Sequence, residues 1–122
     1  MIPKAQVMAE LVAPFSVRSR LAGEEHTVRF SHLWSAIATR HSDTIDCKFL
    51  VNGRGVVVAL ARPAFGECRE RAGRSLTDQE TAAIAAAYLR EYVESDRDLS
   101  GSSLAVSRED VLRLAGSLGF LR

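Results

Sequence analysis

The chain has 122 residues and a formal net charge of +1; 47% of its residues are hydrophobic and 25% are charged. This length is too short for two ordinary domains, so we expect residues 1–122 to fold as one domain whose core needs neither disulfide nor metal. The nearly balanced charge gives no general attraction to nucleic acid, membranes or acidic partners. Only Lys4 and Lys48 are lysines among 16 basic residues, a bias towards arginine that is typical of GC-rich bacterial genomes.

The first segment of the chain predicts a helix over residues 3–13. Apolar residues that share one helical face follow Pro3: Val7, Met8, Leu11, Val12 and Phe15. Glu10 interrupts the apolar stretch and no small-residue cleavage site follows it, so we predict no signal peptide. No apolar run approaches the roughly 20 residues needed to span a bilayer, and we expect a cytoplasmic protein.

The next part of the chain carries weaker signals. Residues 16–25 have no sustained period and are predicted to be a connection, with Phe15, Val17 and Leu21 in contact with the core. Residues 26–41 alternate as in a strand and also place apolar residues at helical spacing. We predict a short strand at 27–30 and a helix at 32–41; a strand that continues through this region stays open as the alternative.

The strongest local signal is a β-hairpin around Asn52 and Gly53. Residues 44–51 alternate between apolar and polar, and residues 55–62 are again mostly apolar. Asn and Gly accept the positive φ angles of a type I′ turn, which fixes the register. The predicted pairs on the buried face are Val51–Arg54, Phe49–Val56, Cys47–Val58 and Ile45–Leu60. The opposite face is expected to be half solvated and carries Asp46, Lys48, Val57 and Ala59.

Two helices are predicted after the hairpin. Pro63 begins the first and Gly73 ends it. Its expected buried face contains Phe65, Cys68 and Ala72. A capping box formed by Thr77 and Glu80 begins the second helix, which is expected to continue to about residue 96. Its expected apolar face contains Ile84, Ala85, Tyr88, Leu89 and Tyr92.

The C-terminal part is predicted to be a linker and one further helix. Residues 96–106 are rich in Ser, Asp and Gly and are expected to be flexible. Ser107 caps a helix over residues 107–119, whose apolar face contains Val111, Leu114, Ala115 and Leu118. The expected fold is α+β: a small antiparallel sheet, made of the hairpin 44–51/55–62 and a third short strand, is covered by helices, with the core in residues 26–95.

The histidines and cysteines form no recognisable catalytic or metal-binding motif. His26, His32, His41, Cys47 and Cys68 show no HxxxH, HExxH or CxxC spacing, so we predict no catalytic residue, no metal and no cofactor. The two cysteines are expected to be reduced, buried thiols. Convergence of the three histidines with Cys68 would instead indicate a small enzyme with a His/Cys pocket, and this alternative stays open.

Five arginines are candidate contacts for an anion or a nucleic-acid backbone: Arg54, Arg62, Arg69, Arg71 and Arg74. Arg54 belongs to the hairpin tip, and the other four surround the helix that begins at Pro63. Glu67 precedes Arg71 and Glu70 precedes Arg74 by four residues, a spacing that favours ion pairs within the helix. A self-neutralised helix surface is therefore the competing interpretation, and nucleic-acid binding is the less favoured one.

The expected function is a non-enzymatic protein-interaction or regulatory module that forms a homodimer. A hairpin sheet has two open edges, and its outer face offers apolar residues such as Leu50 and Val57. So short a chain has little else with which to cover these surfaces. A protein partner or a second copy of the chain would cover them, either by two-fold pairing, the commonest form of oligomer, or by exchange of the C-terminal helix between subunits.

Overall fold

The computed structural model describes residues 11–36, 44–97, 99 and 103–121. Its elements, in chain order, are β1 (Phe15–Arg18), β2 (Glu25–Ala36), β3 (Thr44–Val51), β4 (Arg54–Ala61), α2 (Pro63–Ala72), α3 (Asp78–Glu94), β5 (Ser103–Val106) and α4 (Arg108–Ser117). The described strands form one sheet in the order β1-β2-β3-β4-β5. Neighbouring strands are antiparallel from β1 to β4, whereas β5 is parallel to β4.

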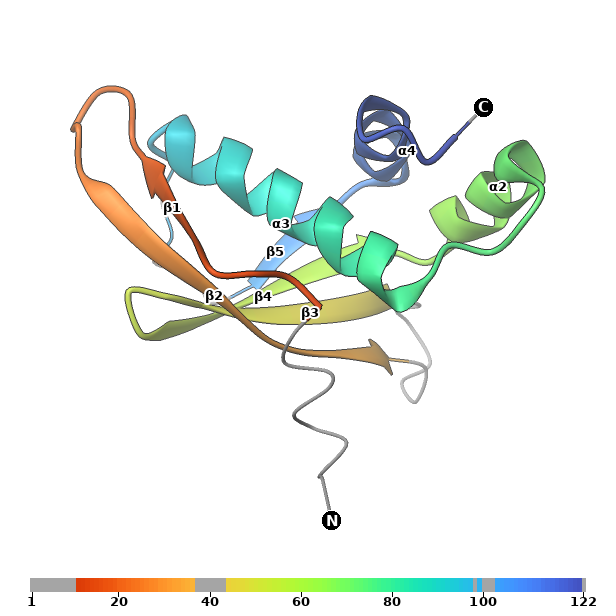
Figure 1. Ribbon diagram of the computed structural model, residues 1–122, viewed down its shortest axis with the longest axis horizontal. Helices are drawn as coiled ribbons and strands as arrows, with labels where there is room; N and C mark the ends of the chain where they lie inside the picture. The colour runs from red at the N-terminus through yellow and green to blue at the C-terminus, as the bar shows by residue number, and fades with distance from the viewer. Residues whose placement is uncertain (1–10, 37–43, 98, 100–102, 122) are drawn as a thin grey trace, which may run out of the picture.

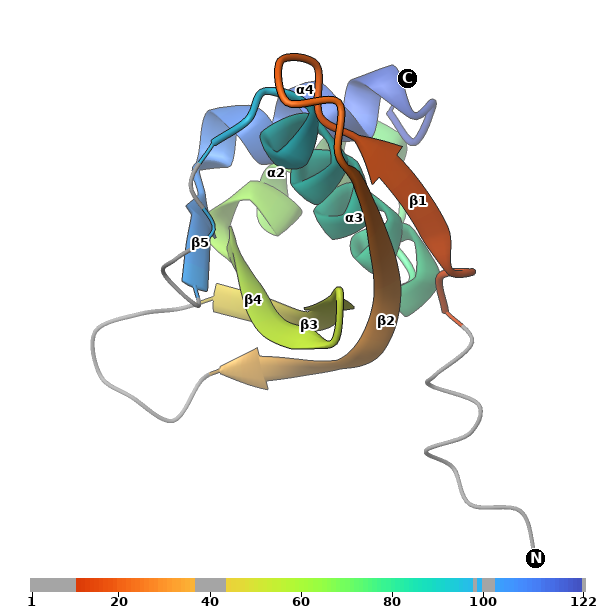
Figure 2. The same cartoon turned by 90° about the vertical axis from the view of Figure 1, so that its left-hand side faces the viewer.

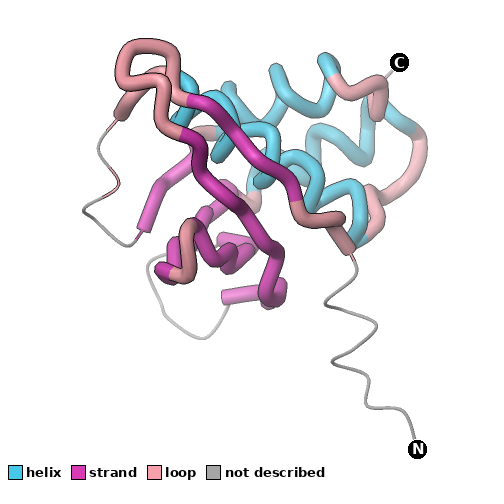
Figure 3. The backbone as a smooth tube through the Cα atoms, turned by 60° about the vertical axis from the view of Figure 1, so that its left-hand side comes forward, coloured by secondary structure: helices cyan, strands magenta, loops and turns pink. Residues whose placement is uncertain are grey.

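The three described helices lie on one face of the sheet (Figure 1). The sheet bends strongly, so that β1 and the first half of β2 rise beside α3 while β3 and β4 pass beneath it (Figure 2). The pairing of β2 with β3 shifts between Phe30 and His32, and such bulges increase the bend and twist of a strand. The sheet therefore wraps around α3, as the tube view also shows (Figure 3).

The hairpin of β3 and β4 has the predicted register. Val51 pairs with Arg54, and the same register continues to the far end of both strands. The turn residues Asn52 and Gly53 have φ angles of 53° and 83°, as a type I′ turn requires. Every second residue of both strands faces the helices; Cys47, Phe49, Val51, Val56, Val58 and Leu60 are buried there, whereas Ile45 is half-buried and Arg54 is exposed. The predicted hairpin and its buried face are thus confirmed.

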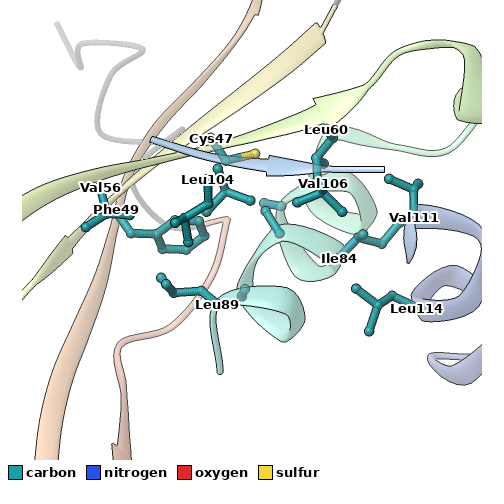
Figure 4. Packing of buried hydrophobic residues seen from close by; sticks show 14 of the residues in the cluster. Cys47, Phe49, Val56, Leu60, Ile84, Leu89, Leu104, Val106, Val111 and Leu114 are labelled. Carbon is teal, nitrogen blue, oxygen red and sulfur yellow. The ribbon is translucent and has the colours of Figure 1, made fainter. Parts of the chain in front are cut away.

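The core lies between the concave face of the sheet and the helices (Figure 4). Phe49 is completely buried in it, and its ring meets that of Phe30 edge-on, with the ring centroids 5.6 Å apart. The large buried side chains come from the sheet and from α3 and α4: Val28, Phe49, Val56, Val58, Leu60, Ile84, Leu89, Leu104, Val106, Val111 and Leu114. The core therefore joins segments from both ends of the chain.

The helix ends follow the predicted signals. Pro63 occupies the first turn of α2, and Gly73 ends it with a φ angle of 76°. The side chain of Thr77 accepts a hydrogen bond from the backbone N–H of Glu80, whose carboxylate accepts one from the N–H of Thr77. At the start of α4, the side chain of Ser107 accepts a hydrogen bond from the backbone N–H of Asp110. These three helices were predicted with nearly correct bounds because their end signals are local.

The predicted α+β class is confirmed, but the sheet is larger than the predicted hairpin with a third short strand. The prediction of a helix at 32–41 is wrong as far as Ala36, because β2 continues to that residue; residues 37–43 lie outside the described part. Pairing with β3 decides the ambiguous pattern, since Leu33 lies opposite Cys47 in the sheet. Tertiary pairing here overrides the helical spacing.

Two predicted connections contain strands. Residues 15–18 form β1 within the stretch that was expected to be irregular after the first helix. Of that predicted helix, residues 3–10 lie outside the described part and residues 11–13 are not helical. Ser103–Val106 form β5 within the predicted flexible linker, where Leu104 and Val106 face the core. Both strands have four residues, and each pairs with the edge of a longer strand: β1 with β2, and β5 with β4.

The C-terminal helix packs on its own chain. α4 contacts α2, α3 and β4. Val111, Leu114 and Ala115 are buried in these contacts, whereas Leu118 is 41% exposed. Gly119 has a φ angle of 84°, and the N–H of Phe120 donates to the carbonyl of Ala115, which ends the helix. The apolar face of α4 is therefore covered without a second chain.

Candidate functional site

The candidate arginines Arg71 and Arg74 are paired with carboxylates. Arg71 donates to Glu67 at 2.8 Å, and Glu67 also accepts from Arg108 of α4. Arg74 binds Glu80 through two hydrogen bonds of 2.8 Å each. The i,i+4 pair of Glu67 and Arg71 that the sequence indicated is present, whereas Arg74 reaches forward to the first turn of α3. Arg74 thus connects the segment after α2 to α3, and Glu67 connects α2 to α4, whereas Arg71 pairs within α2.

The pairing at the start of α3 changes the chemistry of Glu80. Its bonds from Arg74, and then from the backbone of Thr77, lower the pKa of the Glu80 carboxyl from 4.5 to about 2. The same pairing raises the pKa of Arg74. Both groups stay charged at neutral pH, so they hold the corner between α2 and α3 rather than exchange protons.

The other three candidate arginines lie in two places. Arg62 and Arg69, from α2, line one cavity. Arg54 lies at the other end of β4, beside the hairpin turn. The eight residues of β4, Arg54–Ala61, lie between the hairpin turn and Arg62 and span about 26 Å of extended strand. The five arginines therefore do not form one continuous surface, and nucleic-acid binding stays an untested prediction.

The described cysteines are buried and unreactive. Cys47 and Cys68 are free thiols with no exposed surface. Burial, aided by the nearby negative charge of Asp46, raises the pKa of the Cys47 thiol to about 12. Burial also raises the pKa of the Cys68 thiol. Since the thiolate is the nucleophile and the metal ligand, neither residue is prepared for those roles.

The two described histidines, His26 and His32, lie at different places along β2. His26 lies at the start of β2, where its ring meets the Asn52 side chain at 3.0 Å. His32 lies beyond the bulge, and its ring meets the hydroxyl of Ser31 at 3.0 Å. His41 lies outside the described residues. Within the described ranges, no group of three or more His, Cys, Asp or Glu residues is arranged to hold a metal ion.

The edge of β2 is paired over only part of its length. The N–H and C=O of Thr27 bind Asn52, so this residue faces the hairpin. The backbone N–H and C=O groups of successive residues in a strand point to opposite edges. Those of Val28 therefore point towards β1, where Val28 pairs with Phe15. This is the last pair of β1 with β2. From residues 29 to 36, no described strand covers the edge of β2 opposite β3.

The backbone groups that face this open edge follow from the register. Val51 and Arg54 form the hydrogen-bonded pair that closes the hairpin. Lys48 and Asp46 therefore direct their backbone N–H and C=O groups towards β2 rather than β4. Their partners on β2 are His32 and Trp34. The alternate residues Leu33 and Ser35 therefore direct their N–H and C=O groups towards the open edge. We call residues 29–36 the open segment of β2.

The sheet face opposite the helices, which we call the convex face, is of mixed character. The predicted residues Asp46, Lys48, Val57 and Ala59 all lie half-buried there, as does Leu50. No described helix covers this face (Figure 2). The predicted half-solvated face of the hairpin is thus confirmed. The apolar residues of β4 lie opposite charged residues of β3 on this face, because Lys48 pairs with Val57 and Asp46 with Ala59.

The connection between β1 and β2 ends in a rigid turn with an exposed leucine. The Asp96 carboxylate accepts a hydrogen bond of 2.8 Å from the N–H of Leu21, and the carbonyl of Glu94 accepts one of 3.1 Å from Arg20. The bond from Leu21 is the main cause that lowers the pKa of Asp96. The side chain of Leu21 is nevertheless 88% exposed, so the expected contact with the core is wrong. An ordered backbone here presents an apolar side chain to solvent.

No described helix is long and apolar enough to cross a membrane. No protein-family model, no curated protein and no solved structure matches the chain. The sequence indicated the convex face, but it indicated neither the open segment nor the exposure of Leu21. The open segment was missed because residues 26–41 match a strand pattern and a helical spacing equally well.

Proposed function

We propose that the chain is a non-enzymatic protein-interaction module and that it pairs with a second copy of itself through the open segment of β2. No described strand covers the edge of β2 over residues 29–36, and this observation carries the proposal. Eight residues of extended strand present about 26 Å of backbone donors and acceptors. Strand addition at such an edge gains main-chain hydrogen bonds along its whole length.

A two-fold arrangement fits this edge. The open segment of one copy lies antiparallel to the same segment of the other, so that Leu33 and Ser35 exchange backbone bonds with the partner copy. The same surface is used twice, and the two sheets become continuous. The convex faces of both copies then lie side by side and enlarge the area that a further protein partner can contact. The closed packing of α4 argues against exchange of that helix as the route to a dimer.

Two other observations support an interaction role. The thiols of Cys47 and Cys68 are kept neutral by burial, which removes the residues most suited to nucleophilic catalysis. Leu21 is held outward on an ordered turn, where an apolar side chain can enter a partner at little entropic cost. Both features suit recognition by surface contact.

The mass in solution tests the proposal. Size-exclusion chromatography with light scattering, at about 1 to 100 µM, should show a mass that rises with concentration from 13.3 kDa towards twice that value. Ser35→Pro removes an N–H that faces the open edge and keeps the bonds to β3. This variant should stay monomeric at every concentration while its far-UV spectrum is unchanged.

Ser16→Pro is the matched control. Since Phe15 faces β2, the N–H of Ser16 points away from β2, towards the outer edge of β1. This variant should associate as the unaltered chain does. A mass fixed at 13.3 kDa for the unaltered chain, or loss of association in Ser16→Pro alone, would contradict pairing through the open segment.

A further inference from the structure

A cavity of about 350 Å³ opens at the end of the molecule where α2 turns into α3. Four half-buried apolar side chains line it: Leu33 and Ile45 from the sheet, Phe65 from α2 and Leu76 from the connection between the helices. The volume lies within the range of small-molecule sites, and the mixture of an apolar lining with a few polar groups is typical of them. The cavity and the proposed dimer share Leu33 but use different groups of it: its side chain lies on the concave face with that of Ile45, whereas its backbone faces the open edge.

The charged groups around this cavity favour an anion. Arg62 and Arg69 line it, and Asp78 is the one carboxylate among its lining residues. Arg69 forms no ion pair with any described residue, and its helix position directs it to the same face as Arg62 and Phe65. Arg69 is thus an exposed cation at the cavity that no described carboxylate neutralises by an ion pair. An arginine at the rim of an apolar cavity matches a carboxylate that carries an apolar body.

Gly66 keeps part of the cavity open. It lies inside α2, where a glycine destabilises a helix by about 1 kcal/mol relative to alanine. A Cβ atom built on Gly66 would have no heavy atom within 4 Å, so neither crowding nor a positive φ angle requires glycine there. Because Gly66 lines the cavity, any side chain at this position would project into space that a ligand can use.

We propose that this cavity binds a small organic carboxylate with an apolar body, whose carboxylate lies at Arg69 and whose body lies among Leu33, Ile45 and Phe65. Octanoate is a suitable probe because it combines one carboxylate with a flexible apolar chain. The binding is followed by calorimetry and by amide chemical shifts, below the micelle-forming concentration of the probe. The largest shifts are expected in α2 and in the connection to α3.

Two variants separate the charge from the space. Arg69→Ala removes an exposed cation and should weaken octanoate binding about tenfold, as loss of one charged hydrogen bond does. Gly66→Leu fills the cavity and should abolish binding while it maintains or raises the unfolding temperature, because leucine favours the helix. Gly116→Leu is the matched control, since Gly116 also lies inside a helix with open space around it, away from this cavity.

Neutral and cationic analogues complete the test. Octanol and octylamine carry the same chain, and both should bind at least tenfold more weakly than octanoate. Equal binding of octanoate and octanol, or no effect of Arg69→Ala, would overturn recognition of the carboxylate. No binding of octanoate at about 10 mM, or binding that survives Gly66→Leu with shifts elsewhere, would overturn the site itself.

Discussion

Two neighbouring strands, β3 and β2, differ in how completely their backbone is paired. β3 lies between two antiparallel partners over its whole length, and its buried face meets α3. Along its second half, β2 has β3 as its one described partner, and no described strand covers its other edge. Complete pairing and burial concentrate stability, whereas an open edge retains unused bonding groups. The comparison indicates that one strand holds the fold and the other is available for recognition.

Amide hydrogen exchange should show this difference most strongly. The N–H groups of Cys47 and Phe49 face β4 and should exchange only through global unfolding. Those of Leu33 and Ser35 face the open edge and should exchange at least about 10³-fold faster in a dilute monomer. If β2 pairs with a second copy, their exchange slows as the protein concentration rises. Equal protection at high dilution would show that the edge is covered within one chain.

Phe49→Ala should have the largest effect of any single substitution considered. Phe49 is fully buried against Phe30, and loss of a buried aromatic side chain costs about 3 to 5 kcal/mol of unfolding free energy. Lys48→Ala, on the convex face of the same strand, should change it by less than about 0.5 kcal/mol. Chemical denaturation measures both values. Similar effects of the two substitutions would mean that the faces of β3 are exchanged.

The capping box of α3 should contribute less than the core. Thr77→Ala removes the hydroxyl that accepts from the N–H of Glu80 and should lower the unfolding free energy by about 1 kcal/mol. Thr77→Ser keeps the hydroxyl and should behave nearly as the unaltered chain. If both variants lose the same unfolding free energy in denaturant titrations, the loss comes from the methyl group that both lack and not from the hydrogen bond of the cap.

The pH dependence of Glu80 follows from its pKa. The folded-state pKa of about 2 lies below the ordinary value of 4.5, so Glu80 stabilises the fold above pH 4.5 and loses this effect as the pH falls towards 2. Glu80→Gln should therefore be less stable than the unaltered chain at pH 6, and the difference should shrink between pH 4.5 and 2. A difference that is constant over this window would exclude the carboxylate as its source.

The sequence predicts well those elements whose signals are local. Asn52 and Gly53 determine the hairpin register, and Thr77 with Glu80 marks the start of α3, because these groups act on their immediate neighbours. The strands that it missed depend on distant partners. Leu104 and Val106 form β5 only because β4 offers a parallel edge, although serines surround them in the sequence.

The candidate site was harder to predict than the fold for the same reason. An open edge depends on where the neighbouring strand ends. The residue types at 29–36 give no indication that the pairing of β1 with β2 ends at Val28. The arginines of α2 were identified from their spacing, but their separation into paired and cavity-lining residues depends on Glu80 and on the position of the sheet. Those contacts join residues that are far apart in the chain.

Leu21→Ser should have the smallest effect on stability and a clear effect on recognition. Leu21 is 88% exposed, so its removal takes almost no apolar surface out of the core and should change the unfolding free energy by less than about 0.5 kcal/mol. The turn itself is held by Asp96, whose carboxylate accepts from the N–H of Leu21, and this bond is unaffected by the side chain. If the turn belongs to an interface, Leu21→Ser weakens self-association in light scattering, whereas Asp96→Asn loosens the turn and shows as faster amide exchange at Leu21. Unchanged association of Leu21→Ser at every concentration would confine the interface to the open segment of β2.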